Sequence, residues 1–180
     1  MMKTVYTLAR PIAGILLLAA ALNSSAQMAA PSHPPMFTTP AAPVWNPPTN
    51  WTAGPSSVMV VKSFSITGSA GQSAKVAISA FPGDVGGSFA NVNRWRAQTG
   101  LPPIEESALA ANTQSIAVAG GTATLVDLAN PDGGHPRLVA AIVPHGTNTW
   151  FFKLTGDASL VGQEKASFIK FVQTVVYPQP

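Results

Sequence analysis

The residues best suited to do chemistry lie in a glycine-rich stretch from Phe81 to Arg96. An alternating apolar run ends at Pro82, and a run with helical spacing begins after Gly87, so the stretch is predicted to turn from a strand into a helix. The first N–H groups of a helix lack partners within it, and the helix dipole favours an anion there. The candidate ligand-binding residues of this turn are Asp84, Gly86, Gly87, Asn91 and Arg94.

Two interpretations of this turn are open. In one, the free N–H groups bind a small anion or a peptide carboxylate, with Asn91 and Arg94 close by. In the other, which we favour, the glycines only allow backbone angles that other residues rarely adopt. Asp84 beside the turn disfavours an anion. The spacing matches neither a phosphate-binding loop nor a dinucleotide fingerprint.

The rest of the sequence shows no pattern typical of a catalytic or metal site. It contains no cysteine, which excludes disulfides and thiolate chemistry. His135 and His145 could combine with Asp127 and Asp132 in a metal site or a Ser-His-Asp arrangement, but their spacing supports neither. Both histidines stand beside proline or glycine, and we interpret them as turn residues. The sequence therefore predicts no catalytic residue, metal or cofactor.

The N-terminal residues 1–26 have the pattern of a signal peptide. Lys3 and Arg10 precede an apolar run at 11–22, and small residues end the segment before Gln27. The run is shorter than the roughly 20 residues that span a bilayer, so cleavage is expected rather than an uncleaved anchor. We expect a periplasmic or secreted protein with no stable membrane span after cleavage.

Residues 27–50 contain seven prolines and are expected to form an extended, disordered linker, from which Val44 and Trp45 could reach the domain. Residues 51–180 have the length of a single domain. The net charge of +3 comes from few, scattered basic residues, two of them in the signal peptide. Nucleic acid is therefore excluded as a partner, because it needs clustered basic residues.

The hydrophobic pattern of residues 51–180 predicts an α+β domain, in which helices sandwich an antiparallel sheet of about six strands. Asp84 or Ser88 is expected to cap the first helix, and Asp157 the last. The expected strands are 58–66, 75–81, 113–118, 122–128, 136–143 and 149–155, and the expected helices are a helix ending at Gly100, a short helix at 104–111 and a final amphipathic helix at 158–176.

Four runs carry a resemblance to known proteins. The runs Phe81–Gly87, Asn91–Arg96, Gly100–Pro103 and Trp150–Asp157 resemble those of a group of uncharacterised exported bacterial proteins. The order of elements is similar to that of the Mog1, PsbP and DcrB fold group. This resemblance implies an accessory or binding role and no catalytic residue.

A helical wheel places one charge on the buried side of each main helix: Arg96 in the first and Glu164 in the last. An unpaired buried charge is costly, so each is expected to find a partner or to keep its charged end at the rim. If the helices share one side of the sheet, the two should pair. If they do not, Lys153 is the expected partner of Glu164 and Asp127 that of Arg96.

These observations predict an exported, non-enzymatic binding or accessory protein of the cell envelope. Its partner would be an envelope protein or a small anionic ligand. The alternative is a periplasmic hydrolase or another enzyme whose site forms only on folding.

Overall fold

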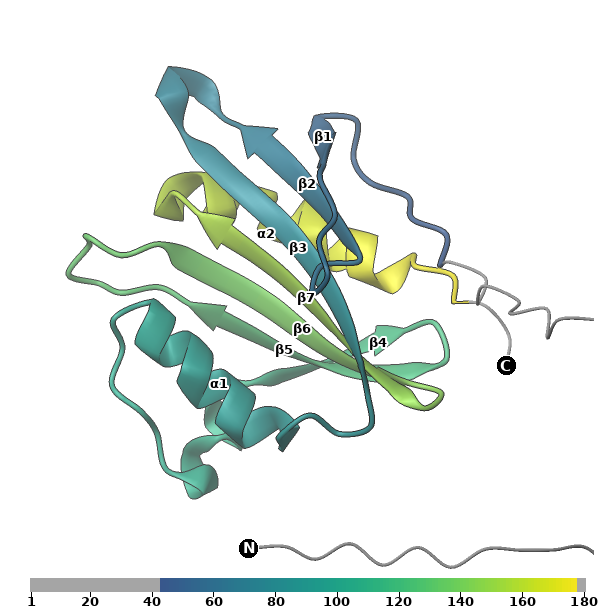
Figure 1. Ribbon diagram of the computed structural model, residues 1–180. Coiled ribbons are helices and arrows are strands. Elements are labelled where there is room, and N and C mark those ends of the chain that lie inside the picture. The colour runs from purple at the N-terminus through teal and green to yellow at the C-terminus, as the bar shows by residue number, and fades with distance from the viewer. Residues whose placement is uncertain (1–42, 178–180) are drawn as a thin grey trace, which may run out of the picture. The chain divides into compact units, whose positions relative to one another are not determined.

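The computed structural model describes residues 43–177 (Figure 1). The predicted signal peptide and residues 27–42 of the predicted linker lie outside the described residues. None of the helices in the described range has both the length and the apolarity needed to cross a bilayer.

Seven strands form one antiparallel sheet in the order β1-β2-β3-β7-β6-β5-β4. The α+β prediction is therefore confirmed, with one strand more than expected. The extra strand is the short β1. It follows the proline-rich stretch and lacks the alternation of apolar and polar residues from which a strand is predicted. The strands are β1 Trp51–Gly54, β2 Lys62–Thr67, β3 Ser73–Pro82, β4 Gln114–Val118, β5 Gly121–Leu128, β6 Arg137–His145 and β7 Asn148–Gly156.

The two helices cover opposite faces of the sheet (Figure 1). Helix α1 (Gly87–Gln98) packs Val92 and Trp95 against β5 and β6. Helix α2 (Ala158–Gln173) packs Phe168 and Phe171 against the other face. Side chains along a strand alternate between the two faces, so adjacent residues of one strand belong to different cores.

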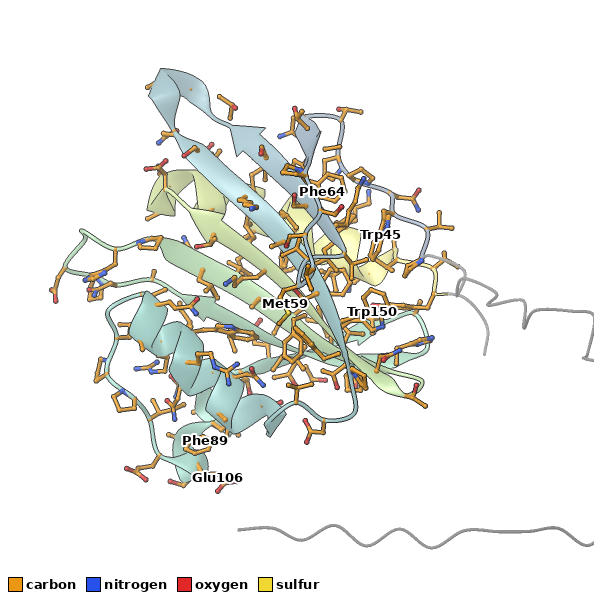
Figure 2. The ribbon with its side chains drawn as sticks, in the orientation of Figure 1. Trp45, Met59, Phe64, Phe89, Glu106 and Trp150 are labelled. Carbon is orange, nitrogen blue, oxygen red and sulfur yellow. The ribbon has the colours of Figure 1, made fainter. Side chains whose placement is uncertain are left out.

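Residues 43–50 pack on the domain instead of forming a free linker. Val44 forms a β-bridge with Val176, and the Trp45 ring lies 5.9 Å from that of Trp150. Trp45 also packs against Phe152 and Phe171 in the α2 core (Figure 2). The folded unit therefore begins before Trp51.

Three predicted element bounds are wrong. The strand expected at 58–66 starts at Lys62, because Ser57 and Val60 close a tight turn before it. The helix expected at 104–111 is two 3₁₀ turns, Glu106–Ala108 and Ala110–Asn112, after the donor-poor Pro102–Pro103 pair. The last helix ends at Gln173.

The predicted helix caps are confirmed only in part. Gly86 occupies the N-cap of α1, while the Asp84 carboxylate accepts a hydrogen bond from the Gly87 N–H at 3.0 Å. Asp157 does stand at the N-cap of α2, but its carboxylate accepts from the Ser73 N–H at 2.6 Å and so connects the helix to the start of β3.

The ion pairs predicted for Arg96 and Glu164 do not form within residues 43–177. Because the helices lie on opposite faces, Arg96 cannot meet Glu164. Arg96 donates to the Pro102 carbonyl at 2.7 Å, and Glu164 accepts from Trp51. Both charged side chains are half-buried, and each is bonded to a neutral group. Lys153 faces α1 and donates to Gln98, on the wrong side of the sheet for Glu164.

Candidate functional site

Hydrogen bonds connect the five predicted ligand-binding residues, which lie in the turn after β3 and on helix α1. Gly86 (φ 79°) and Gly87 (φ 65°) both adopt left-handed backbone angles. These angles are the ones required by the second interpretation of the turn, in which the glycines serve only the backbone conformation. The Gly87 N–H is already bonded to Asp84, and the Gly86 N–H donates to the Asp84 carbonyl at 3.0 Å.

Asn91 connects this turn to the rest of the site. Its side chain is 3% exposed, and its amide donates to the carbonyls of Val85 (2.8 Å) and Gly87 (2.7 Å). The remaining Asn91 oxygen accepts from Arg94 Nη1 at 3.0 Å. The buried amide thus holds the turn closed and positions an exposed guanidinium, which keeps further N–H donors free for a ligand.

Asn91 and Arg94 line a groove of about 400 Å³ between α1 and the part of the sheet that α1 leaves uncovered. Its surface is mainly apolar. The floor comes from β3 and β7, one wall from α1 and the preceding turn, and the other wall from the loop between β1 and β2. The lining residues are Ala77, Ser79 and Phe81 of β3, Phe151 and Lys153 of β7, Val85, Asn91, Arg94, Trp95 and Gln98, and Met59 and Val60.

The β1–β2 loop presents apolar side chains to solvent at this groove. Met59 is 60% exposed and lies over the middle of the sheet (Figure 2), where its carbonyl accepts a hydrogen bond from the Ser79 hydroxyl. Val58 and Val61 beside it are also exposed. The Val61 N–H donates to the Ile78 carbonyl at 2.8 Å, which fastens the loop to β3.

Lys153 places a positive charge in the groove. Its Nζ donates to the Gln98 side chain at 3.3 Å. Burial lowers the pKa of Lys153 below its ordinary value, and the nearby charge of Lys75 lowers it further. No aspartate or glutamate is among the described residues that line the groove.

The other charged cluster of the domain lies on the opposite face. Asp127 contacts Arg137 at 2.7 Å and Lys165 of α2 at 2.8 Å. Burial alone would raise the pKa of Asp127, but the hydrogen bonds and charges of these two partners outweigh it and hold the pKa below its usual value. This ion-pair network joins β5, β6 and α2.

The remaining residues considered from sequence form no site in the described range. His145 stacks on Tyr177 with ring centroids 4.2 Å apart, and His135 packs beside Gly100. Burial raises the pKa of the Tyr177 hydroxyl. Residues 43–177 hold no group of three or more histidine, aspartate and glutamate side chains arranged to bind a metal.

Sequence reasoning found Asn91 and Arg94 but missed the groove around them. The apolar run at 58–61 belongs to the predicted strand 58–66, whereas in the structure Met59 and Val60 lie in a loop that lines the groove. A usable signal is the pair Phe151 and Lys153, which share one side of β7 and place a cation beside an aromatic ring. The single short helix on that side of the sheet is too small to cover the whole face.

Comparisons with known proteins show limited similarity. No family model and no curated protein matches the sequence, so the resemblance to an exported bacterial family stays a prediction. LpqN of Mycobacterium tuberculosis, described as involved in cell envelope biogenesis, is 13% identical with a TM-score of 0.46, over 78% of this chain and 87% of that chain.

Two further solved structures are similar at the same level. PA94 of Pseudomonas aeruginosa, a protein of unknown function, is 15% identical with a TM-score of 0.45, over 73% of this chain and 99% of that chain. The cyanobacterial PsbP of Synechocystis sp. PCC 6803 is 13% identical with a TM-score of 0.45, over 82% of this chain and 98% of that chain.

Proposed function

We propose that this chain is an exported, non-enzymatic binding protein, and that it holds a small ligand in the groove between α1, β3 and β7. The observation that carries this proposal is the groove itself. It is concave, mainly apolar and of a volume within the range of small-molecule sites, and a few polar groups converge on it.

The polar groups of the groove support binding rather than catalysis. Arg94 and Lys153 offer hydrogen-bond donors to a ligand, and the Ser79 hydroxyl is engaged with the Met59 carbonyl. A nucleophile needs an adjacent base to activate it. No histidine or carboxylate stands beside Ser79 among the described lining residues, which disfavours the hydrolase alternative.

Export rests on the sequence of residues 1–26, with cleavage before Gln27. The test is cell fractionation followed by N-terminal sequencing of the exported protein. A mature chain that begins at Gln27 is expected. A chain that stays in the cytoplasm, or still begins at Met1, would overturn this part of the proposal.

Binding is tested with the neutral apolar dye N-phenylnaphthylamine, whose fluorescence rises on entering an apolar site. Ala77 lies on the groove floor, so Ala77→Phe should fill the groove and lower dye affinity at least tenfold. Ala166→Phe, at an exposed site on α2, is the matched control and should bind the dye as the wild type does. Equal affinity in both variants, or no dye binding by the wild type, would overturn the proposal.

A further inference from the structure

The two ends of the groove differ in chemistry. Within the β3–β7 ladder, Lys153 pairs with Ala77, and Lys75 is its diagonal neighbour on the same face. At the other end, the rings of Phe81 and Phe151 lie 5.9 Å apart. The groove is therefore cationic at one end and aromatic at the other.

The length of the groove follows from the strand register. From the Ala77–Lys153 pair to the Phe81–Thr149 pair there are four residues along β3, which correspond to about 14 Å of antiparallel strand. Helix α1 runs antiparallel to β3 (Figure 1), and Gln98 at its C-terminal end accepts a hydrogen bond from Lys153. The groove thus has the elongated form that suits an extended chain with one polar end.

The apolar part of the groove leaves hydrophobic surface open to solvent within residues 43–177. Met59 is 60% exposed, and Phe81 and Phe151 are half-buried. Covering this surface with an aliphatic chain would remove apolar area from water on both sides.

Among the residues that the structure describes, no carboxylate lines the cationic end of the groove. The Lys153 ammonium is half-buried and donates to the neutral Gln98 amide at 3.3 Å. Lys75, the diagonal neighbour of Lys153, adds a second cation on the same face. Both cations would be stabilised by an anionic group on the ligand.

We propose that the ligand is a fatty acid of about twelve carbons, with its carboxylate bound by Lys153 and Lys75 and its chain lying along Phe151, Met59 and Phe81. This inference rests on the proposed binding function and names its ligand class. The charge of the groove argues for an acid head, and the continuous apolar floor argues for a single chain.

The test is isothermal titration calorimetry with monomeric dodecanoate, with dodecyltrimethylammonium as a probe of similar chain and opposite charge. Dodecanoate should bind at least tenfold more tightly. Lys153→Gln should weaken dodecanoate binding about tenfold and leave the affinity for dodecyltrimethylammonium equal or higher. Lys170→Gln, an exposed lysine of α2, is the matched control and should bind as the wild type does.

The apolar contacts are tested with chain length and with Met59. Each buried methylene is worth up to about fourfold in affinity, so binding should tighten stepwise from octanoate to decanoate to dodecanoate. Met59→Ser should weaken dodecanoate binding severalfold. Val176→Ser is its control, because Val176 is 56% exposed against 60% for Met59 and stands outside the groove.

The outcomes distinguish failure of the fatty-acid inference from failure of the binding function. If the neutral dye binds but dodecanoate and dodecyltrimethylammonium bind equally, the fatty-acid inference fails and the binding function stands. If neither the dye nor any amphiphile binds, both fail. If the protein sediments with phosphatidylglycerol vesicles yet binds no monomeric dodecanoate, the groove is a membrane-contact surface and the inference is overturned.

Discussion

The indole Nε1 of Trp51 donates a hydrogen bond to Oε2 of Glu164 at 3.0 Å, which fastens the edge strand β1 to helix α2. The other carboxylate oxygen accepts from Asn50 Nδ2 at 2.8 Å. The helical wheel placed the Glu164 charge on the buried side of α2. In the structure two neutral donors bind this carboxylate at the rim of the core, and both come from the start of the domain.

Removing the Glu164 carboxylate should destabilise the fold. Glu164→Ala would leave the buried Trp51 indole N–H without its acceptor, at a cost of about 1–3 kcal/mol in the free energy of unfolding. Glu164→Gln keeps one acceptor and should lose less. Urea unfolding of both variants measures the difference, and equal losses would show that the indole bond contributes little.

The packing of residues 43–50 predicts that Trp45 belongs to the core. Trp45→Ala should lower the free energy of unfolding by about 2 kcal/mol or more, less than for a fully buried tryptophan because the ring is half-buried. Val44→Ala is the control, since its side chain is 57% exposed, and should change stability little. A chain starting at Trp51 that melts at the same temperature as one starting at Pro43 would contradict this prediction.

The Asp127 network predicts a loss of stability in acid. Because its folded pKa is lowered, Asp127 stabilises the fold above its unfolded pKa of about 3.9 and loses this contribution as the pH falls through the folded value. Asp127→Asn should cost about 1 kcal/mol or more at pH 7, and the difference from wild type should shrink below about pH 4. Urea unfolding at both pH values measures this, with Asp132→Asn on an exposed turn as the control. A difference that does not depend on pH would exclude the ion pairs as its source.

The left-handed angles of the glycine turn predict a backbone cost on substitution. Gly86→Val should lower stability by about 1–2 kcal/mol, because residues with a Cβ avoid this conformation, whereas Gly86→Asn should lose less. Arg94→Ala should stay within about 0.5 kcal/mol. Phosphate should not raise the wild-type melting temperature, because Asp84 already holds the Gly87 N–H. A phosphate-dependent rise that Arg94→Ala abolishes would instead identify the turn as an anion site.

The lowered pKa of Lys153 predicts how fatty-acid binding depends on pH. A bound carboxylate favours the protonated lysine, so affinity is complete below the pKa of the free protein and falls as the pH rises through it. Since that pKa lies below the usual value of about 10.4, dodecanoate affinity should begin to fall at a lower pH than it would for a lysine of ordinary pKa. Calorimetry from pH 7 to pH 10 measures this. Lys153→Gln should show a smaller fall, and an identical profile would remove Lys153 from the site.

Local patterns in the sequence determined most of the secondary structure. Apolar runs bounded by turn residues predicted strands within β2, β3, β4, β5, β6 and β7, and the short turns between them predicted antiparallel pairing. The apolar stripe of Leu160, Phe168 and Phe171 predicted a buried face of α2. These predictions succeed because periodicity within one element reports which of its own residues are buried.

The tertiary structure alone decided which residues meet. Glu164 and Trp51 are 113 positions apart, and their bond depends on the face of the sheet that α2 covers, which no local period encodes. The same choice placed Lys153 under α1 instead of beside Glu164. Because α1 covers β5 and β6 and leaves part of β3 and β7 open, Phe151 and Met59 line a groove instead of completing a core.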